Sequence, residues 1–294
     1  MVVDVGLPLV LAFIMFALGL GLTTDDFVRV LAYPKAIIAG GVAQLMLIPL
    51  TALALLSVSG LDPLLKFGVM ILAFCPGGVV SNIMSKLARG NVALSVSLTG
   101  VISLISILTI PLFMGLAARR FLGAEAVSLD VSALGIRTFA MVALPVGLGV
   151  AVRRFLPQLS RAMAPSVDKA AFALFVLVAV LAIVSNVDLI IENAAALGPL
   201  LLAMNLSLLG VGLLAALVLR LDVPTQTTLA IETGIQNTVL GMTLAGVVAG
   251  QLGHTDSLFP AYAMPAAVYG LVFYIGAAPF IIWSRSRRGP VRPA

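Results

Sequence analysis

Long apolar stretches separated by short polar gaps run along the whole chain. Nine of them are long enough for an α-helix to cross a bilayer, which takes ~20 residues. Backbone groups in lipid must find their partners within the segment, so we expect each stretch to be helical. The segments are 4–22, 34–58, 62–89, 91–118, 132–155, 166–187, 195–220, 224–250 and 256–284. The pattern predicts an all-α polytopic membrane protein with about nine transmembrane helices.

Composition supports this class. Of the 294 residues, 61% are hydrophobic and 10% are charged, and the mean hydropathy is +1.19. A soluble globule has no interior large enough to hide that much apolar surface. The net charge of +5 would suggest nucleic acid in a soluble protein, but the basic residues here are scattered over loop-sized gaps. We therefore expect a lipid bilayer as the environment and no nucleic-acid partner.

The Lys and Arg residues orient the segments. If the C-terminus is cytoplasmic, thirteen basic residues fall on the inside and four, Lys66, Arg119, Arg120 and Arg137, fall on the outside. This positive-inside bias predicts a multi-pass protein of the inner (plasma) membrane. With an odd number of spans the N-terminus lies outside, and residues 286–294 form a basic cytoplasmic tail.

Two segments are interrupted in comparable ways. Segment 62–89 contains Pro76-Gly77-Gly78, and segment 224–250 contains Thr233-Gly234. Both breaks place a flexible or helix-breaking element and a following amide side chain at mid-membrane depth. One such break is also explained by a kink absorbed in packing. A pair in the two halves of a chain is typical of transporters built from inverted repeats.

Glu232 is the only acidic residue deep inside an apolar segment. A carboxylate at that depth is costly unless it is paired, binds a cation or faces a water-filled cavity, so it indicates a functional site. The alternative is a protonated structural carboxyl group. We expect no enzyme and no catalytic residues, because the chain has one His, one Cys and no second buried acid.

Oxygen-bearing side chains accompany this carboxylate. Ser95 and Thr99 lie four residues apart, as do Glu232 and Gln236, so each pair shares one helix face. Oxygen ligands suit a hard cation such as Na⁺. Taken singly, these side chains are also explained by hydrogen bonds within or between helices, and the same holds for the lone amides Gln44 and Asn205.

Two stretches resemble the bile acid:sodium symporter family. Residues 75–99 read CPGGVVSNIMSKLARGNVALSVSLT, and residues 231–237 read IETGIQN, with the family's Glu-x-Gly-x-Gln-Asn pattern. The similarity covers nearly the entire chain, although the loop 23–27 matches only loosely. Many family members have ten spans in two inverted repeats, and this chain resembles the nine-span members, which lack the first span.

The resemblance implies a Na⁺-coupled symporter of a small organic anion that works by alternating access. It also implies a core domain that holds both broken helices and a smaller panel domain packed against it. In this sequence the core would cover 34–120 and 195–285, and the panel would cover 1–33 and 132–190.

The resemblance also implies ligands for sodium, the transported cation. Carried over by motif, the first sodium site would use Ser81, Asn82, Ser95, Thr99 and Glu232. The second would use Gln44, Glu232 and Gln236 with the carbonyl groups of Thr233 and Ile235.

For the anion, we expect contacts with Asn237 and with the backbone around Gly77, Gly78 and Val79, because helix N-termini carry partial positive charge. Val79 is apolar where some relatives carry a hydroxyl group, so a bile acid, a small carboxylate and other organic anions all stay open as substrates. The rival hypothesis is a proton-coupled or arsenite-type carrier on a related fold, with Glu232 or Cys75 as the working group.

Overall fold

The computed structural model describes residues 6–23, 33–185, 187–254 and 259–287, and every regular element in them is helical. The first half contains α1 (Leu7–Gly21), α3 (Pro34–Val42), η2 (Ala43–Leu47), α4 (Ile48–Ser57), α5 (Pro63–Phe74), α6 (Val79–Leu87) and α7 (Val92–Phe121). The second half contains η3 (Gly123–Ser128), α8 (Val131–Thr138), η4 (Phe139–Ala143), α9 (Leu144–Phe155), α10 (Pro157–Val184), α11 (Val187–Val218), α12 (Val223–Gly234), α13 (Thr238–Leu252), η5 (Ala261–Ala263) and α14 (Met264–Ser286).

The all-α polytopic class is confirmed. Within the described residues, six helices are long and apolar enough to cross a membrane, and the bent pair α5–α6 brings the number to seven. Helix α1 is apolar but shorter. The pair α12–α13 contains the polar run 225–228 and Glu232, which lowers its hydropathy. The count of nine spans stays a prediction.

Two helices begin earlier than the hydrophobic pattern suggests. Helix α10 starts at Pro157 rather than at 166, and α11 starts at Val187 rather than at 195. Pro157 occupies the first helical turn, where its missing N–H is not needed. The polar residues that follow are compatible with a helix, so α10 extends beyond its apolar stretch. Hydrophobicity marks where a helix can sit in lipid, and it does not mark where the helix ends.

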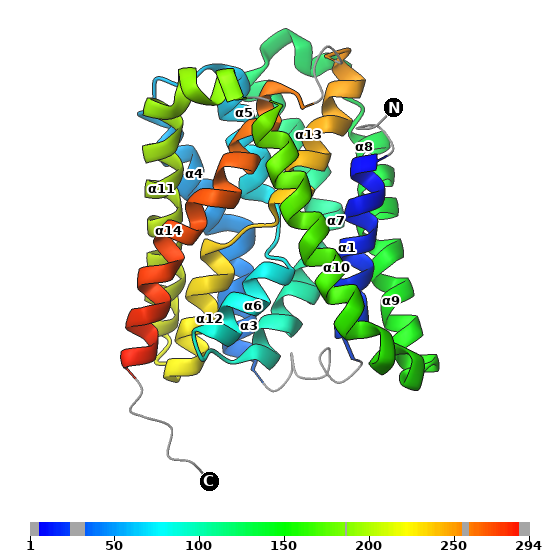
Figure 1. The fold of residues 1–294 in the computed structure, drawn as a ribbon. Coiled ribbons are helices and arrows are strands. Elements are labelled where there is room, and N and C mark those ends of the chain that lie inside the picture. Colours follow the sequence, from blue (N-terminus) through cyan, green and yellow to red (C-terminus); the bar gives the residue numbers. More distant parts are fainter. Residues whose placement is uncertain (1–5, 24–32, 186, 255–258, 288–294) are drawn as a thin grey trace.

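Helices α1, α9 and α10 pack together on one side of the molecule, and α10 also contacts α14 (Figure 1). Small residues allow α1 and α9 to approach closely. A Cβ atom on Gly19 would collide with the Val146 carbonyl group, and one on Gly149 would collide with the Phe16 carbonyl group. Close contact through glycine is a common way for membrane helices to associate. The division into core and panel domains stays a prediction.

Both predicted breaks exist, and they meet near the middle of the molecule (Figure 1). Helices α5 and α6 are separated by residues 75–78 and bent by 66°. Helices α12 and α13 are separated by the non-helical residues 235–237. The backbone N–H of Asn237 donates a 2.8 Å hydrogen bond to the Pro76 carbonyl group. The two breaks are therefore joined directly, main chain to main chain.

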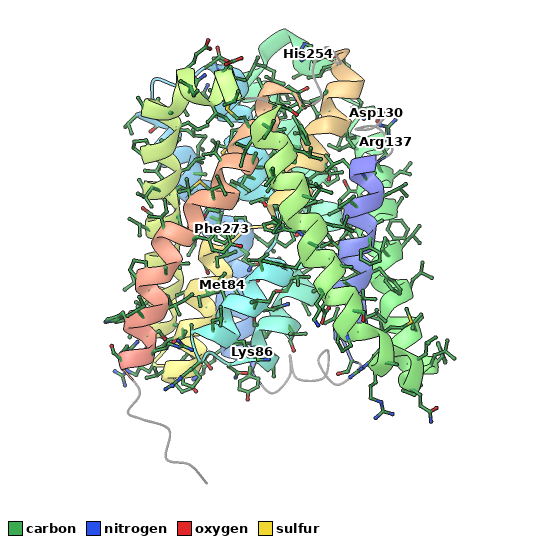
Figure 2. All side chains as sticks on the ribbon, in the orientation of Figure 1. Met84, Lys86, Asp130, Arg137, His254 and Phe273 are labelled. Carbon is green, nitrogen blue, oxygen red and sulfur yellow. The ribbon has the colours of Figure 1, made fainter. Side chains whose placement is uncertain are left out.

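Basic residues lie at both ends of the helix bundle, and Lys86 and Arg137 mark opposite ends (Figure 2). Lys86 is one of the thirteen basic residues predicted on the inside and Arg137 is one of the four predicted on the outside, and the two lie toward different ends of the bundle. Which end is cytoplasmic stays a prediction. Arg29, Arg288 and Arg292 and most of the predicted tail 286–294 lie outside the described residues.

Candidate functional site

Glu232 is fully buried on the last turn of α12, where helix α7 supplies hydroxyl groups to its carboxylate. Thr99 Oγ1 donates a 2.8 Å hydrogen bond to Oε2, and the Ser95 hydroxyl group donates to Oε1. Both hydroxyl-bearing residues are also fully buried. The four-residue spacing read from the sequence therefore places both side chains on the face of α7 that meets α12.

Helix α6 completes this group. Asn82 Oδ1 accepts hydrogen bonds from Ser95 at 2.8 Å and from Thr99 at 3.4 Å. The Ser81 hydroxyl group donates to the Gly78 carbonyl group at 2.8 Å and accepts from the Gly78 N–H at 3.2 Å. The first broken helix thus brings its two predicted ligand residues beside the carboxylate.

Gly77 makes this close approach possible. A Cβ atom at this position would lie 2.7 Å from Glu232 Oε2 and 3.0 Å from Ser81 Oγ. Oxygen atoms of Glu232 and Ser81 therefore flank a bare α-carbon. The structure brings all five predicted ligands of the first sodium site together from α6, α7 and α12, and every donor atom is an oxygen.

Gln44 and Gln236 lie at the end of α12. Gln44 belongs to η2, a single π-helical turn, a feature that is frequent at functional sites. Its Nε2 donates to the Glu232 carbonyl group at 3.1 Å, and Gln236 Nε2 donates to the Thr233 carbonyl group at 2.7 Å. The Thr233 hydroxyl group donates to the Leu229 carbonyl group within α12. The Thr233 carbonyl group is therefore the atom that would bind a cation.

Both glutamines present a buried oxygen atom that accepts no hydrogen bond from the described residues, namely Oε1 of Gln44 and Oε1 of Gln236. A buried acceptor without a partner is costly, so each instance in a folded protein calls for an explanation. A bound cation could supply the missing interaction. Both side chains donate to neighbouring carbonyl groups at the end of α12, and the second sodium site stays a prediction.

A small cavity of about 20 Å³ lies where the two breaks face the α1–α10 side. Residues 78–80 and 236–239 form one wall, and Ile14 and residues 171, 172 and 175 form the other. Of the predicted anion contacts, Gly78, Val79 and Asn237 line this cavity. Gly77 does not line it and lies against Glu232 instead.

Several lining residues were missed by the sequence analysis. Thr238 is buried, and its hydroxyl group has no hydrogen-bond partner among the described residues. Its position directly after Asn237 was a signal that could have identified it. Ile14 and Phe175 gave no such signal, because an apolar residue that faces a cavity looks the same in sequence as one that faces lipid.

Several known proteins are similar to this chain in sequence. The model of the Sodium Bile acid symporter family matches residues 8–193. The uncharacterized sodium-dependent transporter YocS of Bacillus subtilis is 33% identical over 269 residues, which cover 89% of this chain and 77% of the relative. The chain belongs to the sodium bile acid symporter family. The residues matched by the family model include α5, α6 and α7, while Glu232 lies beyond them.

Other members of the family align over most of the chain. The probable chloroplastic sodium/metabolite cotransporter BASS1 of Arabidopsis thaliana is 30% identical over 273 residues, covering 92% of this chain and 65% of its own length. The human ileal sodium/bile acid cotransporter is 28% identical over 240 residues, covering 81% of this chain and 68% of its own length. The chain thus spans about two thirds of the length of these relatives. Their names describe transport rather than catalysis.

Proposed function

We propose that this protein is a sodium-coupled symporter that carries a small organic anion across the plasma membrane by alternating access. The observation that supports this most is the buried Glu232 carboxylate, which accepts hydrogen bonds from α7 hydroxyl groups and lies against Gly77 in the break between α5 and α6. A full negative charge in a low-dielectric interior needs a cation nearby. The family membership and the sodium-dependent relatives point to the same ion.

The first sodium ion would be held by Ser81, Asn82, Ser95, Thr99 and Glu232. In the structure the two α7 hydroxyl groups donate to the carboxylate. When a cation binds, these hydroxyl groups would turn their protons away and present lone pairs to it. Glu232 would then neutralise the ion at the membrane's centre.

The second sodium ion would be held by Gln44, Glu232 and Gln236 and by carbonyl groups at the end of α12. Each glutamine can keep its Nε2 donation to a carbonyl group while its free Oε1 turns to the cation. The carbonyl groups of Thr233 and Ile235 would complete the set. Helix C-termini carry partial negative charge, which favours a cation at this end of α12.

The anion would be held by the starts of α6 and α13. Among the described residues, none that lines the cavity is Lys or Arg. Charge must therefore come from backbone N–H groups, and the first N–H groups of a helix have no partner within that helix. Val79 and Val80 are the first two residues of α6, and Thr238 and Val239 are the first two residues of α13. Asn237 and the free hydroxyl group of Thr238 would add side-chain contacts.

The size of this cavity supports the proposal of alternating access. A space of about 20 Å³ holds roughly one water molecule, so an organic anion cannot enter without a rearrangement. The cavity lies between the breaks and the α1–α10 side. We therefore propose that the panel residues, 1–33 and 132–190, move relative to the core residues, 34–120 and 195–285.

The rival carriers would use other groups. For an arsenite-type carrier the working group would be Cys75, yet its thiol group is buried and bonds to the Ile71 carbonyl group at 3.3 Å. Within the described residues, no three His, Cys, Asp or Glu side chains gather in one place. A proton-coupled carrier would use Glu232 and would function without sodium.

A thermal-shift screen tests the proposal. Purified protein is heated with a panel of organic anions, in NaCl or in choline chloride at equal ionic strength. A ligand that binds the folded state raises the apparent melting temperature. We expect sodium alone to stabilise the protein, and an anion that binds to stabilise it further only in sodium. The same stabilisation in choline would overturn sodium coupling.

A further inference from the structure

The carbonyl group of Gly234, the last residue of α12, accepts two side-chain hydrogen bonds. Asn205 Nδ2 on α11 lies 2.7 Å from this oxygen, and the Tyr269 hydroxyl group on α14 also lies 2.7 Å from it. The two donors are themselves 3.2 Å apart. Asn205 and Tyr269 are both fully buried. Two long helices thus converge on one main-chain oxygen at the second break.

These contacts fix the whole peptide group between Gly234 and Ile235. Its carbonyl oxygen is held by Asn205 and Tyr269, and its N–H donates to the Ile231 carbonyl group at 2.9 Å. One donor would be enough to satisfy a carbonyl group in lipid. A second donor from another direction does more, because it restricts rotation of the peptide plane.

The neighbouring carbonyl groups are held differently. Those of Glu232 and Thr233 each receive one side-chain donor, Gln44 and Gln236 respectively. A carbonyl oxygen has two lone pairs, so each keeps one for another ligand. Gly234 has both occupied and is thereby withdrawn from cation binding. The next carbonyl group, on Ile235, lies directly beyond the fixed peptide.

We infer that Asn205 and Tyr269 are positioning residues for the second sodium ion. They touch neither ion, but they fix the Gly234–Ile235 peptide plane so that the Thr233 and Ile235 carbonyl groups point to the same place. This inference rests on the proposed sodium site. Outer hydrogen-bond partners of this kind typically affect metal affinity by about 10–100-fold.

The packing around Asn205 provides an independent way to disturb it. A Cβ atom on Gly276 of α14 would lie 3.2 Å from Asn205 Cγ and closer still to Oδ1. Gly276→Ala therefore forces the Asn205 carboxamide group out of its present position, while both donor side chains stay chemically unchanged. Tyr269→Phe removes the other donor and keeps the ring. Each variant weakens the hold on the same carbonyl group by a different route.

Matched controls lie on the same helices. Tyr274→Phe removes a hydroxyl group from a half-buried position on α14, and among the described residues the side-chain hydrogen bonds to the Gly234 carbonyl group come from Asn205 and Tyr269 instead. Gly210→Ala adds a methyl group on α11 where nothing lies within 4 Å. If hydroxyl loss or an added methyl group were harmful in general, these controls would reveal it.

The test uses sodium alone as the probe. Each purified protein is titrated with NaCl against choline chloride at constant ionic strength, and the sodium concentration that gives half of the thermal shift is measured. We expect Tyr269→Phe and Gly276→Ala to raise this concentration about tenfold, with both controls at the parent value. Since the readout is the sodium midpoint, a loss of stability that is equal in both salts does not affect it.

The outcomes separate the two proposals. A parent protein that does not respond to sodium contradicts the proposed function itself. A parent that responds while both variants keep its midpoint overturns the positioning role alone. If Tyr269→Phe cannot be purified, Gly276→Ala decides the question by itself.

Discussion

Thr99 Oγ1 lies 2.8 Å from Glu232 Oε2, although the two residues are 133 positions apart in the chain. Thr99 belongs to the first half of the molecule and Glu232 to the second. Neither half alone contains both the negative charge and the hydroxyl groups that surround it. The affinity for any ion bound here would therefore depend on how the two halves pack against each other.

Loss of this charge should abolish the sodium response. Glu232→Gln keeps the shape of the side chain and removes the only full negative charge available to both proposed ions. We expect the variant to insert and fold, and to show no stabilisation by NaCl over choline chloride. Glu192→Gln, at an exposed position on α11, is the matched control. A sodium response of parental size in Glu232→Gln would defeat the assignment.

The α7 hydroxyl groups should affect the anion only through the ion. Ser95→Ala and Thr99→Ala should weaken sodium binding several-fold, and should lower anion affinity only when sodium is limiting. Ser97→Ala is the control, since its hydroxyl group bonds within α7 to Ala93 at 2.9 Å. Calorimetric titration over a range of sodium concentrations makes the comparison. Coupling is reciprocal, so the anion must strengthen sodium binding by the same factor.

Asn237→Ala should behave in the opposite way. Asn237 lines the cavity, and its Oδ1 accepts a 3.0 Å hydrogen bond from Leu240 N at the start of α13. We expect weaker anion binding even at saturating sodium, because the affected group belongs to the anion's side of the break. Unchanged anion affinity at high sodium would remove Asn237 from the binding site.

Gly77 should tolerate no side chain. In Gly77→Ala the new methyl group would meet Glu232 Oε2 at 2.7 Å, so either the carboxylate or the first break must move. We expect the sodium-induced thermal shift to be lost. Gly198→Ala has nothing within 4 Å of the added carbon and should behave as the parent. A Gly77→Ala protein with the parent's sodium midpoint would show that this close approach is unimportant.

The contact between α1 and α9 predicts a difference in stability. Gly149→Ala forces a methyl group into the backbone of α1, and such overpacking typically costs about 1–3 kcal/mol. Gly147→Ala, two residues earlier on the same helix, meets nothing within 4 Å. Thermal unfolding of both proteins in detergent measures the difference. Equal melting temperatures for Gly149→Ala and Gly147→Ala would mean that the close contact between α1 and α9 does not contribute to stability.

Part of the polar cluster around Glu232 was predictable from the sequence for a physical reason. A carboxylate at membrane depth is rare, and hydroxyl groups four residues apart must share a helix face, so Glu232, Ser95 and Thr99 were recognisable. The cavity was only partly predictable. Gly77 and Gly78 are adjacent, yet Gly77 lies against Glu232 while Gly78 lines the cavity. Composition alone cannot distinguish two neighbouring glycines in a non-helical segment.

The positioning contacts were beyond the sequence for another reason. Asn205 was noticed in the sequence as a lone amide that could form a hydrogen bond between helices. In the structure it does so, from α11 to α12. Its target, the Gly234 carbonyl group, is a main-chain atom and leaves no mark in the sequence. Tyr269 lies in an aromatic-rich helix, where nothing distinguishes a tyrosine that donates to a break from one that only packs.

The hydrogen bond between Asn237 N and the Pro76 carbonyl group uses main-chain atoms only. Every residue type except proline can donate it from position 237, so the crossing of the two breaks does not depend on which side chains face the cavity. If the cavity binds the solute as proposed, substitutions at positions 79 and 238 would alter which solute is recognised, while the proposed ion ligands would keep their places. A carrier of the proposed kind could then diversify its cargo over evolution and still inherit an unchanged energy source.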